Sequence, residues 1–208
     1  MPEKIEAPSK EEIALLEPFR GVSPNNIIVP TTKEQFTKAV ADLFRHRFVG
    51  FDTESKPVFV QGQKSDGPHV IQLATLENTY IFQLHYPESI KCIAQLLETT
   101  QIIKVGFGLK SDRAQLHRKL GITPKAILDL DSFFRSEGYR KDLGVKTAIA
   151  VVLHQRFRKS KKISTSNWAR EQLTPEQLSY AANDAYAAIK VFHALNKPES
   201  AFPIVDLT

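Results

Sequence analysis

Three strand-length apolar segments follow one another in the middle of the chain and limit its possible folds more than any other feature. Phe48 to Glu54, Val70 to Thr75 and Thr79 to Leu84 each have the length and the β-branched and aromatic content of a strand. The short turn Leu76 to Asn78 joins the last two, as in an antiparallel hairpin. We therefore expect an antiparallel meander of three strands.

After the meander the hydrophobic pattern changes to an alternation of helices and strands. From Pro87 a helix is followed by a strand at Ile102 to Val105, a helix at Lys110 to Leu120 and a strand at Ala126 to Leu130. This order is typical of parallel crossover connections. The sequence therefore predicts an α/β fold in which helices flank a mixed sheet. Further helices are expected at about 132–137, 142–154 and 174–195.

The ends of the chain differ in character. Residues 1–25 carry prolines and a net negative charge, so we expect a loosely attached N-terminal arm. Residues 26–208 fit a single domain, because one core can grow to roughly 250 residues. Thr174 and Gln177, three residues apart, have the pattern of a capping box, and Pro175 suits the first helical position. This pattern predicts the start of the last helix.

Composition excludes several classes of protein. Lys and Arg number 28 against 23 Asp and Glu, and the net charge of +5 weakly indicates a polyanionic partner. Cys92 is the only cysteine, which excludes an intrachain disulfide, a CxxC redox pair and a cysteine-rich zinc site, and we expect it in a helix core. The first residues carry prolines and five glutamates instead of an apolar run, and no later run of about 20 apolar residues occurs, so we expect neither a signal peptide nor a membrane span. We expect a soluble intracellular protein in a reducing compartment, cytoplasmic in a bacterium and also compatible with the nucleus of a eukaryote.

Two carboxylates in the first strand of the meander form a candidate cation site. Asp52 and Glu54 are two residues apart, so their side chains project from the same face of the strand. The alternative is a solvated strand face, but the preceding residues from Phe48 to Phe51 are mostly apolar. Because a buried carboxylate requires a counter-charge, the pair indicates a bound cation.

Asp112 is a further candidate because it follows a predicted strand end. It lies in KVGFGLKSDRAQL, where Gly106 and Gly108 permit a close approach of the backbone. The alternative is an aspartate in the first helical turn that is favoured by the helix dipole. Spacing alone does not distinguish these two readings.

Tyr180 and Asp184 lie four residues apart and therefore share one face of the last predicted helix. Ala181, Ala185 and Ala188 give that helix a small-residue surface that can approach a sheet closely. The alternatives are a packed helix aromatic for Tyr180 and a solvated charge for Asp184. The two residues carry weight only in combination with the other acidic positions.

Together these segments resemble a known family. FDTE, KVGFGLKSD and YAAND, at 51–54, 104–112 and 180–184, resemble the three motifs of the DEDDy 3′–5′ exonucleases, and RKDLGVKTAIAVVLH and SNWAREQLTPEQLSYAANDAYAA, at 140–154 and 166–188, are most similar to the ribonuclease D and Werner-syndrome exonuclease branch. The resemblance extends from residue 27 to about residue 195. It implies a ribonuclease H-like fold, with three antiparallel strands followed by parallel ones.

The resemblance also implies roles for five residues. Asp52, Glu54 and Asp184 would bind one divalent cation. Asp52 would help to hold a second, and Asp112 would support that second site through water. Tyr180 would orient the attacking water. Two cations about 4 Å apart can stabilise the attacking and leaving oxygens of a phosphodiester, and an all-carboxylate cluster suits Mg²⁺ or Mn²⁺ better than zinc.

Candidate contacts to nucleic acid surround these residues. Cationic side chains bind phosphates without reading sequence, and an aromatic ring can stack on a terminal base. The alternatives are a solvated surface for the cationic residues and a core position for the aromatic one. We expect residues 54–69 to border the cleft. The candidates are Phe51, Lys110, Arg113, Arg156, Arg158 and Lys159.

Three functions remain open on the sequence alone. The favoured one is a metal-dependent 3′–5′ exonuclease that acts on single-stranded or frayed ends of DNA or RNA and releases nucleoside 5′-monophosphates. The second is a nucleic-acid-binding or scaffolding domain of the same fold without turnover, although such a domain has no reason to keep four mutually repelling carboxylates. The third is an endonuclease on the same fold.

Overall fold

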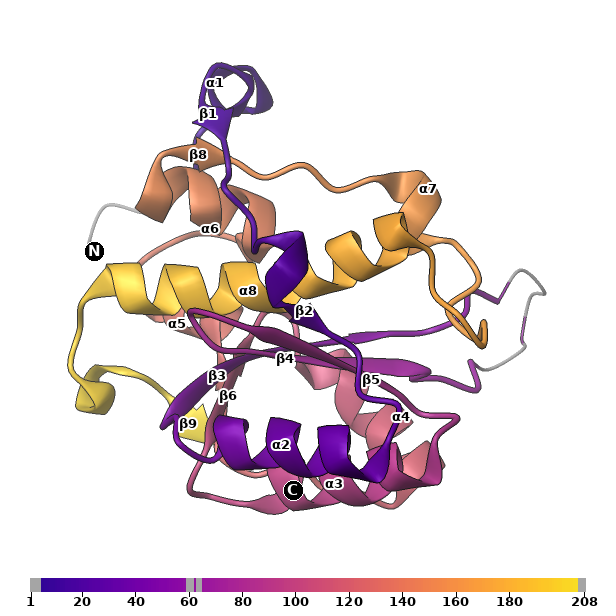
Figure 1. Ribbon diagram of the computed structural model, residues 1–208. Coiled ribbons are helices and arrows are strands. Elements are labelled where there is room, and N and C mark those ends of the chain that lie inside the picture. Colours follow the sequence, from indigo (N-terminus) through magenta and orange to yellow (C-terminus); the bar gives the residue numbers. More distant parts are fainter. Residues whose placement is uncertain (1–4, 59–61, 63–64, 206–208) are drawn as a thin grey trace.

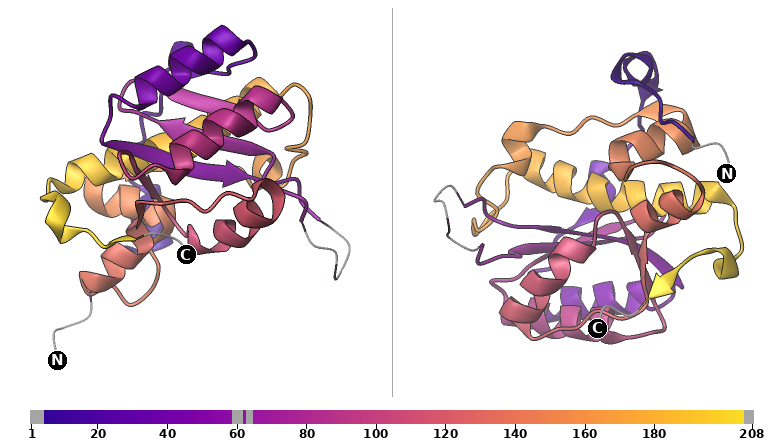
Figure 2. Two further views of the ribbon diagram at one scale, coloured as in Figure 1. Left: turned by 90° about the horizontal axis from the view of Figure 1, so that it is seen from below. Right: turned by 180° about the vertical axis from the view of Figure 1, so that it is seen from behind.

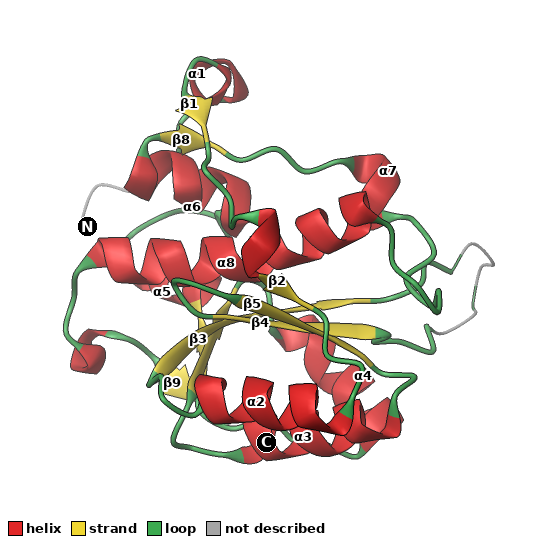
Figure 3. Cartoon of the chain, viewed as in Figure 1, coloured by secondary structure: helices red, strands yellow, loops and turns green. Residues whose placement is uncertain are grey.

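Helices and strands alternate along the chain in the order expected from its hydrophobic pattern (Figure 3). The computed structural model describes residues 5–58, 62 and 65–205, without the side chains of Ser111 and Arg113. The strands are β1 Glu17–Pro18, β2 Ile27–Ile28, β3 Phe48–Glu54, β4 Val70–Ala74, β5 Thr79–Gln83, β6 Ile103–Gly106, β7 Ile127–Asp129, β8 Gln155–Arg156 and β9 Ile204–Val205. The α-helices are α1 Lys10–Ala14, α2 Lys33–Leu43, α3 Pro87–Glu98, α4 Lys110–Leu120, α5 Leu130–Ser136, α6 Gly144–Leu153, α7 Lys161–Ser164 and α8 Pro175–Leu195, with short 3₁₀ turns η1 Pro24–Asn26 and η2 Glu199–Ala201.

The central sheet is mixed, and its strand order is β2-β5-β4-β3-β6-β7-β9. Strands β3, β4 and β5 pair in antiparallel fashion, with Asp52 opposite Gln72. Strands β6 and β7 continue the sheet parallel to β3, while β2 pairs parallel to β5 and β9 pairs antiparallel to β7. The predicted α/β class, with a three-stranded meander followed by parallel strands, is confirmed.

Helices cover both faces of this sheet (Figures 1 and 2). Side chains of α2, α3 and α4 pack against one face, where Phe36, Leu96 and Phe82 belong to one buried cluster. Side chains of α5, α6 and α8 pack against the other face, where Ile103 and Ala185 are buried together. Alternate residues of each strand therefore enter different cores, and the acidic positions of β3 face the α8 side.

Helix α8 lies unusually close to β3. Its start is fixed by the predicted capping box, in which the Thr174 side chain accepts a hydrogen bond from the Gln177 backbone and the Gln177 side chain accepts one from Thr174. A Cβ atom at Gly50 would lie only 1.9 Å from the carbonyl oxygen of Ala185. The absence of a side chain at Gly50 thus allows the contact that brings Asp184 against the strand.

The N-terminal arm is held more firmly than its composition suggested. Strand β1 pairs parallel to β8, and the Phe19 backbone N–H donates to the carbonyl oxygen of Arg156 at 3.0 Å. The Phe19 ring meets that of Phe157 edge to face, with centroids 5.4 Å apart. The Val22 backbone N–H donates to Asn183 Oδ1 at 3.0 Å. The expectation of loose attachment is therefore wrong for residues 17–22, because their partners lie far along the chain and leave no local pattern.

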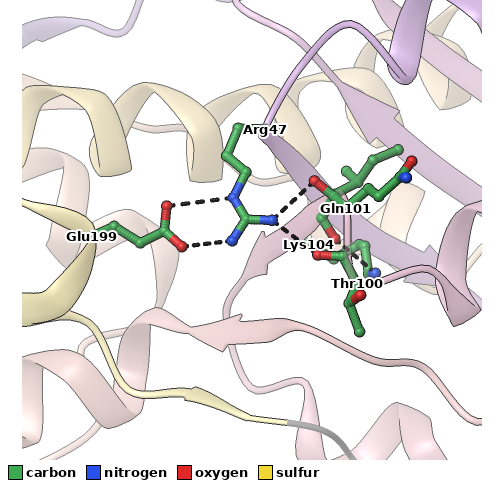
Figure 4. A network of polar contacts seen from close by, with 6 residues as sticks. Arg47, Thr100, Gln101, Lys104 and Glu199 are labelled. Atoms are coloured by element: carbon green, nitrogen blue, oxygen red, sulfur yellow. Dashed lines mark hydrogen bonds and ion pairs between the residues drawn. The ribbon is translucent and has the colours of Figure 1, made fainter.

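A polar network attaches the C-terminal segment to the sheet (Figure 4). The Arg47 guanidinium donates to both carboxylate oxygens of Glu199, at 2.6 and 3.4 Å. Its remaining terminal nitrogen donates to the carbonyl oxygens of Thr100 and Gln101. Arg47 immediately precedes β3, so the network anchors η2 beside the sheet and positions β9 to pair with β7.

Two expectations from composition also concern the fold. Cys92 is half-buried on α3 and packs against the core, and burial raises the pKa of its thiol. Among the helices that the structure describes, none combines the length and the apolar character needed to cross a bilayer.

Candidate active site

Three carboxylates from two elements converge at the end of β3. Asp52 and Glu54 project from the strand, and Asp184 projects from α8, which Gly50 allows to approach. One carboxylate oxygen from each of the three lies within 4.8 Å of the others. This spacing permits all three residues to bind one cation. The expected convergence of the first and third motifs is therefore present.

Burial makes this cluster electrostatically costly. The Asp184 side chain is only 2% exposed. Burial, followed by the charges of Asp52 and Asp184, raises the pKa of Glu54 to about 9. Burial likewise raises the pKa of Asp184 to about 7 and that of Asp52 above its usual range, although Lys159 opposes both shifts. A cation bound among the three would remove this penalty, because it favours the ionised forms.

Asp112 lies beside this group of three and is linked to it through Thr53. The Thr53 hydroxyl donates to Asp112 Oδ1 at 3.1 Å, while the Thr53 backbone N–H donates to Asp52 Oδ1 at 2.8 Å. Burial and the charge of Asp52 raise the pKa of Asp112 to about 7. Thr53 was not singled out in the sequence, although it stands between the two acids of FDTE.

A buried aspartate fixes the turn that carries Asp112. Asp129, at the end of β7, accepts hydrogen bonds from the backbone N–H groups of Gly108 and Leu109 at 3.2 and 3.1 Å. Gly108 has a φ of +65°, a conformation that favours glycine. The turn leads directly into α4, so Asp129 positions its first turn. The sequence offered a weak signal for Asp129, an acid at a predicted strand end.

Lys159 reaches into the carboxylate cluster. Its Nζ lies 2.7 Å from Asp184 Oδ2 and 5.3 Å from the centre of the Tyr180 ring. Burial lowers the pKa of Lys159, but the charges of Asp184 and Asp52 outweigh this and raise it overall. Burial and the charge of Asp184 raise the pKa of Tyr180 to about 12, so its hydroxyl stays protonated at neutral pH.

The other candidate contacts to nucleic acid have different surroundings. Phe51 is 1% exposed and packs in the core on the side of α2 and α3, so the suggestion that it stacks on a base is wrong. Side chains alternate along β3, and Phe51 therefore faces away from Asp52. Lys110 and Arg158 are exposed, whereas Arg156 is half-buried and donates to the Ala14 carbonyl oxygen.

Two expectations fall partly outside the described structure. The side chain of Arg113 is not described, so its contact with nucleic acid stays a prediction. Residues 59–61 and 63–64 of the connection expected to border the cleft also lie outside the described residues. Trp168, which lies before α8, is 1% exposed and packs with Ala181 and Ala182 of that helix.

The donor set of the cluster fits a hard divalent cation. Asp184 Oδ1 is buried, and no described residue forms a hydrogen bond with it. A buried carboxylate oxygen without a partner is unfavourable, whereas carboxylate oxygens are the preferred ligands of Mg²⁺ and Mn²⁺. The residues present therefore suit such a cation.

Comparison with known proteins identifies relatives of this chain. Residues 27–198 match the family described as 3′-5′ exonuclease. The chain is 29% identical over 153 residues to a 3′-5′ exonuclease of Arabidopsis thaliana, covering 71% of this chain and 52% of that protein. It is 30% identical over 174 residues to the bifunctional 3′-5′ exonuclease/ATP-dependent helicase WRN of Mus musculus, covering 75% of this chain but 12% of that protein.

Solved structures share the fold. The EXO domain of Aedes aegypti Nibbler superposes with a TM-score of 0.71 at 22% identity, covering 84% of this chain and 89% of that one. The Trypanosoma brucei RNase D complex with RNA U12 superposes with a TM-score of 0.72 at 22% identity, covering 86% of this chain and 65% of that one. These likenesses confirm the ribonuclease H-like arrangement of the sheet and its helices.

Proposed function

Since the chain belongs to the 3′–5′ exonuclease family, we propose that its carboxylate cluster hydrolyses phosphodiester bonds at the 3′ ends of single-stranded or frayed nucleic acid and releases nucleoside 5′-monophosphates. We further assign it to the DEDDy subtype, with Asp52, Glu54, Asp112, Asp184 and Tyr180 as its active-site residues. The family match supports a domain division in which residues 1–25 form an arm and residues 26–208 the exonuclease domain.

Asp52, Glu54 and Asp184 would hold one divalent cation. Asp52 would also bind a second cation, which Asp112 would support. When bound, Mg²⁺ or Mn²⁺ lowers the pKa of water and stabilises the charge that develops on the attacking and leaving oxygens. The carboxylates stay ionised in that state, because the cations offset the burial that otherwise raises their pKa values.

The chain supplies the remaining contacts. The protonated Tyr180 hydroxyl would orient the attacking water, since Tyr180 lies one helical turn before Asp184. The Lys159 ammonium would attract the anionic phosphate near the scissile bond. The single observation that carries the proposal is the convergence of the Asp52, Glu54 and Asp184 oxygens within 4.8 Å. Nucleic acid as the partner is supported by the related RNase D structure with RNA.

A strand-shortening assay tests the proposal. The protein is incubated with 5′-labelled single-stranded DNA or RNA in Mg²⁺, Mn²⁺ or EDTA, alongside Glu54→Gln. Glu34→Gln is the matched control, because the Glu34 side chain is 76% exposed on α2 and pairs only with Lys38 among the described residues. We expect a ladder that shortens from the 3′ end with metal, is lost in EDTA and in Glu54→Gln, and persists in Glu34→Gln.

Other results separate the alternatives. Binding of the labelled strands without any cleavage would support a nucleic-acid-binding or scaffolding domain instead. Internal cuts in a circular single strand would indicate an endonuclease. A ladder that is unaffected by EDTA would rule out catalysis by metals at this cluster.

A further inference from the structure

A large groove lies beside the candidate active site, on the side of α8 that faces the N-terminal arm. Its volume is about 700 Å³, and it opens between α8 and residues 156–160. Tyr180 and Asp184 form part of its wall, so the groove is continuous with the catalytic cluster. A volume of this size is sufficient for a nucleotide-sized ligand. We call it the arm groove.

The N-terminal arm forms one wall of the arm groove. Its strand β1 lies beside β8, above α8 in Figure 1. Pro18, Phe19 and Gly21 line it, and they precede residue 27, where the match to the exonuclease family begins. The arm is fixed on both sides of the groove, to Arg156 through Phe19 and to Asn183 of α8 through Val22. The arm is therefore a fixed wall of the groove.

The chemistry of the lining fits a polyanion. Asp184 already pairs with Lys159. Of the other charged residues in the lining, Arg156 and Arg158 are positive and the exposed Glu176 is negative. The buried Nε of Arg156 has no hydrogen-bond partner among the described residues. The half-buried Phe19 adds aromatic surface to the wall, and the buried Phe157 supports it from behind with its ring centroid 5.4 Å away. Cationic and aromatic side chains together are the usual lining of grooves for single-stranded nucleic acid.

We propose that the arm groove binds the part of the substrate strand that precedes its 3′-terminal nucleotide, an inference that rests on the proposed function. The terminal phosphodiester lies at Asp184 and the preceding backbone passes Arg158. The N-terminal arm is then part of the substrate-binding surface, because Pro18, Phe19 and Gly21 line the groove. In this arrangement the Arg158 side chain contacts a phosphate of the strand, whereas the negative charge of Glu176 repels that phosphate.

Fluorescence anisotropy with a 5′-labelled dodecathymidine in EDTA tests this. Arg158→Glu should weaken binding by at least about tenfold, because the lost charged contact alone is worth about 1.4 kcal/mol and the new carboxylate also repels phosphate. Glu176→Gln should tighten binding, because it removes the opposing charge. Arg45→Glu is the matched control and should stay within twofold of the parent protein, since the Arg45 side chain is 77% exposed beyond α2 and does not line the groove.

Photo-crosslinking locates the strand in the same samples. With 4-thiothymidine in the dodecamer, we expect crosslinks to peptides that contain Phe19 or Phe157. Equal affinities for Arg158→Glu and Arg45→Glu, no binding by the parent protein, or crosslinks confined to other peptides would each overturn the proposal. Because EDTA prevents metal-dependent hydrolysis, a failure here is distinct from failure of the proposed activity, which the strand-shortening assay reports.

Discussion

The Lys159 ammonium lies 2.7 Å from Asp184 Oδ2, inside the carboxylate group that is suited to a divalent cation. Lys159 comes from the segment that walls the arm groove, whereas Asp184 comes from α8. The lysine charge offsets part of the mutual repulsion of the acids, since it lowers the pKa values of Asp52, Glu54 and Asp184 that burial raises. Lys159 thus serves as an internal counter-ion, and a metal ion that binds these carboxylates would compete with it.

Replacing Lys159 with methionine should therefore change metal affinity and stability in opposite directions. We expect Lys159→Met to bind Mn²⁺ about tenfold more tightly by calorimetry, because the cluster gains about one unit of negative charge. The metal-free variant should lose about 3 kcal/mol of unfolding free energy, because Asp184 is left buried without a partner.

Lys38→Met is the matched control for this change. Lys38 pairs with Glu34 at 2.7 Å, but both side chains are 76% exposed. An exposed pair contributes at most about 1 kcal/mol. Unchanged or weaker Mn²⁺ binding in Lys159→Met would contradict competition between the lysine and the metal.

The stability of the metal-free protein should fall as the pH rises. The pKa of Glu54 is raised from 4.5 to about 9, so between these values the native state binds more protons than the unfolded state. By linkage, unfolding free energy then decreases with pH, by up to about 1.4 kcal/mol per pH unit for each such group. Urea denaturation in EDTA at pH 5.5, 7 and 8.5 measures this slope.

Two comparisons make the pH experiment specific to the cluster. Glu54→Gln should flatten the slope, because the amide does not titrate. Saturating Mn²⁺ should flatten it as well, because a bound cation holds the carboxylates ionised in the native state. Stability that rises from pH 5.5 to 8.5 in EDTA would show that the carboxylates are not destabilised by burial.

Thr53 should position Asp112 through its hydroxyl. Thr53→Val removes the 3.1 Å hydrogen bond to Asp112 Oδ1 while preserving the shape of the side chain. We expect hydrolysis to slow about tenfold, and Mn²⁺ binding at the weaker of two sites to decline, as is usual when a residue that orients a metal-binding carboxylate is replaced. Thr53→Ser keeps the hydroxyl and should restore both. A role limited to packing would instead make the serine variant the poorer of the two.

Tyr180 should act on water and not on the metal. Tyr180→Phe removes the hydroxyl that stays protonated, and we expect a decrease in kcat of about 100-fold, within the usual range for a group that assists proton transfer or orients water. Mn²⁺ affinity, measured by calorimetry, should stay within twofold. Equal losses of turnover and metal affinity would contradict the water-orienting role.

Local sequence patterns were sufficient to predict the parts of the fold and site that depend on neighbouring residues. The two-residue spacing of Asp52 and Glu54 and the four-residue spacing of Tyr180 and Asp184 fix which side chains share a face, whatever packs against them. The same holds for the capping box at Thr174, which marks the start of α8 correctly.

Contacts between distant segments were not predictable in this way. Lys159 lies in a basic run without periodicity, and only the folded path of residues 156–160 carries it to Asp184. The pairing of β1 with β8 involves two residues from each strand, too few to leave a pattern. For Phe51 the core alternative is correct, because a residue next to Asp52 in the strand points to the opposite face of the sheet.

Anomalous X-ray diffraction from crystals soaked in Mn²⁺ tests the central claim most directly, because it locates the metal independently of any substrate. We expect one strong peak bounded by oxygens of Asp52, Glu54 and Asp184, with Lys159 displaced from Asp184. A second, weaker peak is expected between Asp52 and Asp112. Fully soaked crystals with no anomalous peak among these carboxylates, and with Lys159 still paired to Asp184, would contradict the assignment of this cluster as a metal-dependent catalytic site.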